Sequence, residues 1–127
     1  NGQKAFVDEI TALARDHNVH VHLVHHIRKL QSDENMPNKN DLRGSSSITD
    51  QVDNVFIVWR NKKKENEINR GKEADMSEPD MILMNEKQRN GESTEWYHFW
   101  YDRASTQFLE KWQGLVSDFD NRGRFKG

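Results

Sequence analysis

Apolar residues recur every three or four positions over the first part of the chain. They stand at Phe6, Ile10, Leu13 and Ala14, with charged residues between them. This spacing predicts a helix over residues 3–17, with one apolar face and one polar face. Asn18 follows as a residue type that commonly ends helices.

The spacing of the apolar residues changes directly after this helix. Apolar residues alternate with histidines at positions 19–23, and Val24 follows. Alternation of this kind predicts a short strand over residues 19–24, buried by its valines. A helix followed at once by a strand is typical of the second half of a βαβ unit.

The middle of the chain is mostly polar. Residues 27–42 have no apolar period and contain Pro37, so they are predicted to be a loop. Ser47-Ile48-Thr49-Asp50 fits a capping pattern and predicts a short helix. Residues 60–79 are almost wholly charged or polar and are predicted to form a long exposed loop.

Further strands are predicted on both sides of that loop. The continuous apolar run over residues 55–59 indicates a strand covered on both faces. Strands over 81–86 and 95–101 flank the turn signal Asn90-Gly91. A short last strand is expected within 108–112. The fold class is therefore α/β, with parallel strands that end in an antiparallel hairpin.

Composition narrows the possible functions. Of the 127 residues, 33% are hydrophobic, and the formal net charge is −2. Contact with nucleic acid must therefore come from a few local cations and not from a basic surface. The absence of cysteine excludes disulfides and thiolate metal sites. No apolar stretch approaches the ~20 residues of a membrane span, so no membrane partner is expected.

Four of the histidines lie close together, at His20, His22, His25 and His26. Histidine is a common zinc ligand, so a metal-dependent hydrolase is one hypothesis. No cysteine follows, however, and no carboxylate stands at ligand spacing on the predicted strand. We therefore expect surface histidines and no metal site.

Four segments carry a resemblance to a known family. They are the helix and strand ending in His25-His26, Asp41-Leu42-Arg43-Gly44-Ser45-Ser46-Ser47, Asp53-Asn54 with the strand ending Trp59-Arg60-Asn61, and Lys87-Gln88-Arg89-Asn90-Gly91. Their order and spacing, over roughly residues 3–109, resemble the DnaB-type hexameric replicative helicases of bacteria and the phage primase–helicases.

The resemblance implies a partial RecA-like, P-loop NTPase fold. Residues 1–112 would be the C-terminal half of the helicase domain, and residues 113–127 a flexible tail. The sequence has no Gly-x-x-x-x-Gly-Lys-Ser/Thr and no strand ending in a magnesium-binding acid. In the family both lie upstream. ATP and Mg²⁺ are therefore expected as cofactors of a longer protein, and this chain alone is expected to be inactive.

The resemblance also assigns roles to single residues. Arg89 matches the arginine finger, Lys87 matches its partner, and His26 matches a γ-phosphate sensor, with His25 as the candidate if the register differs by one. The DNA-binding positions would be Arg28, Lys29, Arg43, Gly44, Ser45 and Ser46. The family often has glycine where Ser46 stands. Read without the resemblance, the same charges fit an exposed hairpin and solvated loops.

The implied function is ATP-dependent translocation on single-stranded DNA. The implied partners are a homo-hexamer and a primase or primase domain, in the cytoplasm of a bacterial cell, with a phage or prophage as one source. The alternative is a non-catalytic RecA-like DNA- or protein-binding module. The aromatic residues of the hairpin favour core or interface positions over base stacking; they are Trp96, Phe99, Trp100 and Tyr101.

Overall fold

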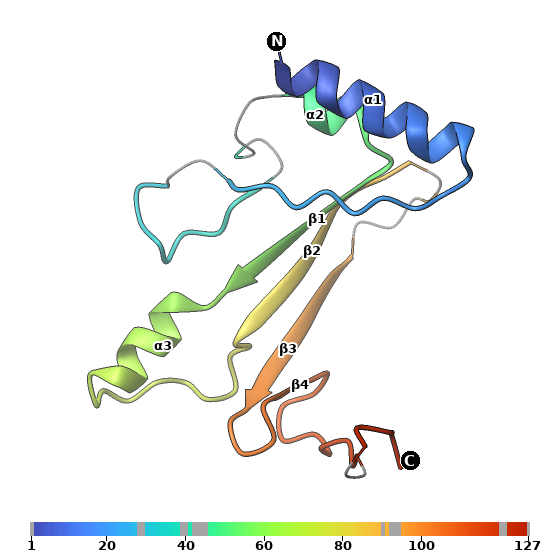
Figure 1. The fold of residues 1–127 in the computed structure, drawn as a ribbon. Helices are drawn as coiled ribbons and strands as arrows, with labels where there is room; N and C mark the ends of the chain where they lie inside the picture. The colour runs from blue at the N-terminus through green and yellow to red at the C-terminus, as the bar shows by residue number, and fades with distance from the viewer. Residues whose placement is uncertain are drawn as a thin grey trace. The chain divides into compact units, whose positions relative to one another are not determined.

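The structure, a computed structural model, describes residues 2–27, 30–38, 41, 46–89, 91, 95–119 and 122–126 (Figure 1). The chain divides into two compact units, and each is described by itself. The first contains residues 1–57 and 85–95, and the second contains residues 58–84 and 96–127. Among the described residues, no helix is long and apolar enough to cross a membrane.

The predicted N-terminal helix is confirmed as α1 (Gly2–Asp16). Asn18 adopts a left-handed backbone conformation, with φ at 50°. Val19 N–H donates to the Ala14 carbonyl at 3.0 Å, which satisfies a carbonyl at the end of the helix. The predicted C-terminal stop is therefore confirmed.

The short helix predicted near Ser47 is confirmed as α2 (Ser46–Gln51). It lies against α1, as Figure 1 shows. Val7 of α1 and Ile48 of α2 are both buried. Phe6 and Leu13 of the predicted apolar stripe are instead 52% and 48% exposed, so the contact between the two helices buries Val7, which the stripe did not include.

The strand predicted over residues 19–24 is absent from the structure. These residues form an irregular segment, and Val19, Val21 and Leu23 are between about a third and a half exposed. Alternation of apolar residues is compatible with a strand, but a strand also needs a backbone partner. The prediction is therefore wrong for this structure, and so is the expected burial by the valines.

Four strands form one sheet in the order β1-β2-β3-β4. They are β1 (Asn54–Arg60), β2 (Met81–Gln88), β3 (Trp96–Asp102) and β4 (Gln107–Leu109). The pairs β2–β3 and β3–β4 are antiparallel, so the predicted hairpin is confirmed, although Asn90 of its turn lies outside the described residues.

The expected parallel strands are not present among the described residues. Arg89 N–H, just past β2, donates to Asp53 O, just before β1, at 2.8 Å. At the other end, Asn61 N–H donates to Asp80 O at 2.9 Å. The start of one strand therefore meets the end of the other, so β1 and β2 also run antiparallel.

Burial along β1 alternates. Val55 and Ile57 are buried, whereas Phe56 and Val58 are 54% and 64% exposed. Antiparallel sheets commonly cover one face and leave the other open. The prediction that both faces of this strand are covered is therefore wrong here.

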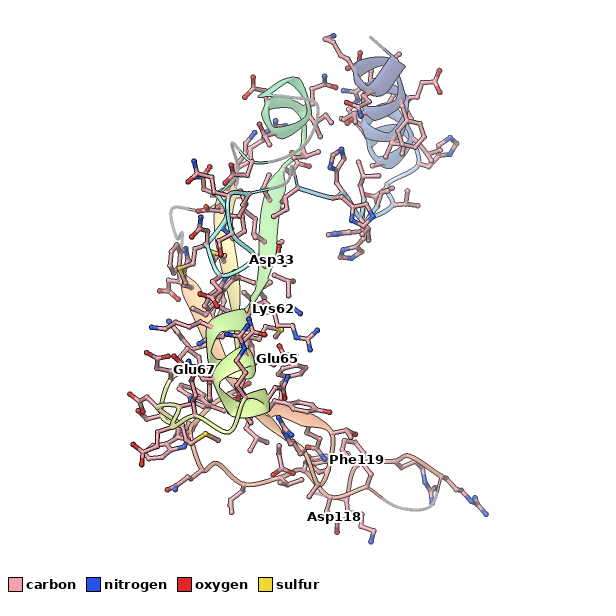
Figure 2. The ribbon with its side chains drawn as sticks, turned by 90° about the vertical axis from the view of Figure 1, so that its left-hand side faces the viewer. Asp33, Lys62, Glu65, Glu67, Asp118 and Phe119 are labelled. Atoms are coloured by element: carbon pink, nitrogen blue, oxygen red, sulfur yellow. The ribbon has the colours of Figure 1, made fainter. Side chains whose placement is uncertain are left out.

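The long loop predicted over residues 60–79 contains a helix, α3 (Lys62–Asn69). Figure 2 labels Lys62, Glu65 and Glu67 on it. The Asn61 side chain caps the helix by accepting from Lys64 N–H at 3.1 Å. Lys64 is 2% exposed and donates to the carbonyls of Met76 and Glu78. These distant partners stabilise a helix whose own sequence has little apolar character.

The C-terminal residues form little regular structure. Phe119 and Phe125 make an isolated antiparallel bridge, with their ring centroids 5.9 Å apart; Figure 2 labels Phe119 and its neighbour Asp118. The assignment of residues 113–127 as a flexible tail stays a prediction.

Candidate functional site

Lys87 and Arg89 point to the same side of the hairpin. Lys87 Nζ donates to the carbonyls of Thr49 at 2.6 Å and Asp50 at 3.2 Å. Arg89 Nη2 donates to the carbonyls of Asp50 at 3.2 Å and Gln51 at 3.4 Å. The two cations thus share one acceptor, the Asp50 carbonyl. Residues two apart on a strand have side chains on the same face. The sequence therefore predicted that these two side chains point the same way.

The acceptors all belong to the C-terminal end of α2. The last carbonyls of a helix have no partner within the helix, and cationic side chains commonly satisfy them. Lys87 and Arg89 therefore cap α2 from the end of β2. Both cations therefore have hydrogen-bond acceptors within their own chain, which the sequence analysis did not predict.

Asp53 is a further partner of Arg89. Its Oδ1 lies 2.8 Å from Arg89 Nη1, and the two side chains are 61% and 46% exposed. The backbone of the two residues is also joined, because Arg89 N–H donates to Asp53 O at 2.8 Å. The sequence analysis missed this pair. Only the antiparallel pairing of β1 with β2 brings Asp53 opposite Arg89.

His26 is exposed and follows the irregular segment, not a strand. His25 Nδ1–H donates to the His26 carbonyl at 2.7 Å, which fixes the ring of His25 against its neighbour's backbone. No contact described for His26 involves Lys87 or Arg89. The structure thus does not join the candidate sensor to the candidate finger, and the role of His26 stays a prediction.

Most of the predicted DNA-binding positions lie outside the described residues. This applies to Arg28, Lys29, Arg43, Gly44 and Ser45. Ser46 is the first residue of α2. The predicted second DNA loop is therefore followed directly, along the chain, by the helix whose far end receives Lys87 and Arg89.

The histidines are also candidate metal ligands. In the part of the chain that the structure describes, no group of three or more His, Asp or Glu side chains is arranged to hold an ion. The rings of His20 and His22 stack on each other, with centroids 4.3 Å apart. The pair alone offers two ligands, fewer than a structural zinc site requires.

The hairpin aromatics are less buried than predicted. Trp96 and Tyr101 are 44% and 41% exposed, so they do not fill the core, and their expected place at an interface stays a prediction. Trp100 is half-buried and its Nε1–H donates to the Ser77 carbonyl at 3.0 Å. Tyr101 stacks at a tilt on Phe108 of β4, with centroids 5.1 Å apart.

Comparison with known proteins adds one finding. The family model described as the DnaB-like helicase C-terminal domain matches residues 4–110. This range holds both cations of the hairpin, α2 and the predicted DNA loops. No curated protein matches the chain, and no solved structure does either.

Proposed function

The chain belongs to the family of DnaB-like helicase C-terminal domains, and from this premise we propose that it is part of an ATP-dependent replicative DNA helicase. The longer protein would move along single-stranded DNA as a homo-hexamer in the cytoplasm of a bacterial cell. The observation that carries this proposal is the family match over residues 4–110, which includes the hairpin with Lys87 and Arg89.

Arg89 acts in this proposal as the arginine finger. A guanidinium presents planar, permanently charged donors that suit phosphate oxygens. During phosphoryl transfer it neutralises charge that builds on the transferred group. Lys87, on the same side of the strand, adds a second positive charge. Both side chains donate to the Asp50 carbonyl, so their charged groups lie close together.

ATP and Mg²⁺ would be held mainly by residues outside this chain. The sequence contains no phosphate-binding glycine loop of the Gly-x-x-x-x-Gly-Lys-Ser/Thr type. The chemistry of Arg89 and Lys87 fits contacts to the γ-phosphate of a nucleotide bound by a neighbouring copy, and in the full-length protein these two groups would make hydrolysis depend on the neighbour. His26 would act as a γ-phosphate sensor.

The DNA-binding role falls on two loops. Arg28 and Lys29 would open the first, and Arg43, Gly44, Ser45 and Ser46 would form the second. Arginine and lysine neutralise DNA phosphates, and consecutive backbone N–H groups can bind an anion. These contacts would position the strand without reading its sequence.

The experiment is an ATPase and strand-unwinding assay of the full-length protein, with and without single-stranded DNA. We expect DNA to stimulate turnover, and we expect Arg89→Ala to lower it by about 10³-fold or more, the range known for such fingers. Arg103→Ala, an exposed arginine in the turn after β3, serves as the control and should behave like the wild type.

A protein that binds DNA without hydrolysing ATP would contradict the proposal. It would instead support the alternative of a non-catalytic RecA-like binding module. The capping of α2 by Lys87 and Arg89 is the specific observation that favours this alternative, because it gives both cations a structural role.

A further inference from the structure

The guanidinium of Arg89 is engaged by its own chain at both terminal nitrogens. Nη1 meets the carboxylate of Asp53 at 2.8 Å, and Nη2 donates to the carbonyls of Asp50 and Gln51. A guanidinium grips a phosphate best with two parallel N–H groups. While these contacts persist, the edge of Arg89 that carries both terminal nitrogens is not free to bind a phosphate in that way.

The hold on Arg89 is reversible. The side chains of Arg89 and Asp53 are both about half exposed, and ion pairs of this kind contribute little and are screened by salt. The contacts of Arg89 with Asp50 and Gln51 are long, at 3.2 and 3.4 Å. A ligand with more negative charge than one carboxylate can therefore displace them.

The element that holds Arg89 is also the element next to the predicted DNA loop. α2 begins at Ser46, the last residue assigned to that loop, and ends at Gln51, which accepts from Arg89. Six residues of helix span only about 9 Å. The carbonyls that accept from Arg89 therefore lie within one short helix of that predicted loop.

We propose that Asp53 is a positioning residue, which with the C-terminal carbonyls of α2 holds Arg89 on its own subunit and keeps it from a phosphate. The inference rests on the proposed function, and it gives that site a regulation: the contacts of Arg89 within its own chain limit ATP hydrolysis until the arginine is released.

The test compares ATP hydrolysis by the full-length protein with and without single-stranded DNA. Asp53→Ala removes the carboxylate, so the DNA-independent rate should rise by roughly five-fold, the factor that corresponds to about 1 kcal/mol. The ratio of stimulated to basal rate should fall by the same factor. Loss of the overall fold would lower the rate, so a rise distinguishes the release of Arg89 from global unfolding.

Three variants complete the design. Asp53→Glu restores a carboxylate and should return the basal rate toward the wild type. Asp53→Asn keeps the size of the side chain and removes only its charge, so it replaces the alanine variant if that one fails to fold. Asp8→Ala is the matched control, because it breaks another exposed ion pair of the same unit, with Lys4, and should leave the basal rate unchanged.

The outcomes separate the two proposals. A higher basal rate in Asp53→Ala, reversed in Asp53→Glu, supports the hold on Arg89. A folded Asp53→Ala protein with an unchanged or lower basal rate overturns the inference that Asp53 holds Arg89 back. DNA-stimulated hydrolysis by the wild type would still support the proposed function in that case. A wild-type protein without any ATP hydrolysis overturns both.

Discussion

Lys64 Nζ lies 2.9 Å from Asp80 Oδ1, and the lysine side chain is only 2% exposed. The same nitrogen donates to the carbonyls of Met76 at 3.3 Å and Glu78 at 2.7 Å. All three donors of the ammonium group are therefore satisfied. This one side chain ties α3 to the residues that lead into β2.

Replacement of Lys64 by alanine should destabilise the protein by about 1–3 kcal/mol, because the carbonyls of Met76 and Glu78 and the Oδ1 atom of Asp80 lose the lysine donor. Lys63→Ala is the matched control, since Lys63 is exposed on the same helix and should cost no more than about 0.5 kcal/mol. Urea unfolding followed by circular dichroism measures both. Equal midpoints for the two variants would show that Lys64 does not hold α3 in place.

The carboxyl group of Asp102, where β3 leads into the turn before β4, should make the stability of the protein depend on pH. The hydroxyl of Ser105 and then its backbone N–H donate to Asp102, and they hold the pKa of Asp102 below its usual value. Because the folded pKa is lowered, this stabilisation is complete above the unfolded pKa of about 3.9 and is lost as the pH falls through the folded pKa.

Ser105→Ala should raise the pKa of Asp102 toward its usual value, as measured by NMR titration of the carboxyl carbon. Asp75 is an internal reference, since Ser77 lowers its pKa in the same way and the substitution does not touch it. An unchanged titration of Asp102, or an equal shift of both carboxyl groups, would refute this account of the turn.

The purified 127-residue chain should show no ATP hydrolysis above background, with or without DNA. The physical reason is that its sequence lacks the phosphate-binding loop and the magnesium-binding strand end of the family. A radioactive phosphate-release assay provides the sensitivity that this prediction needs. Turnover that disappears in Arg89→Ala would prove the prediction wrong.

Arg43→Ala in the full-length protein should weaken binding to single-stranded DNA and leave the DNA-independent ATPase rate intact. Loss of one phosphate contact should also reduce the slope of log affinity against log salt by about 0.7, the value per contact for single-stranded DNA. Fluorescence anisotropy at several salt concentrations measures both quantities, with Arg103→Ala as the control. An unchanged salt slope would remove Arg43 from the DNA contacts.

Local patterns were sufficient for α1, β1 and the β2–β3 hairpin. α1 has an apolar stripe and a residue at Asn18 that tolerates the left-handed conformation, and both signals lie within one segment. The hairpin has apolar strands on either side of a strong turn pair. These signals act between neighbours in the sequence, so they can be read without the fold.

Long-range interactions account for what the sequence analysis missed. α3 depends on Lys64 reaching Met76, Glu78 and Asp80, and no local period reveals these partners. The alternation over residues 19–24 predicted a strand, but alternation cannot supply the neighbouring backbone that a strand requires. At the candidate site, the spacing of Lys87 and Arg89 predicted that their side chains share one face of the strand. No local pattern predicted their contacts with Asp53 and with the end of α2.

The central claim is that Arg89 serves a nucleotide bound by another subunit, and mixed rings test it most directly. One full-length variant carries Arg89→Ala, and the other carries a disabled phosphate-binding loop. Each alone should be inactive. Mixed in equal amounts, they should recover DNA-stimulated ATP hydrolysis, because some interfaces combine an intact nucleotide site with an intact Arg89. Mixed rings that form but stay as inactive as either variant alone would contradict the account.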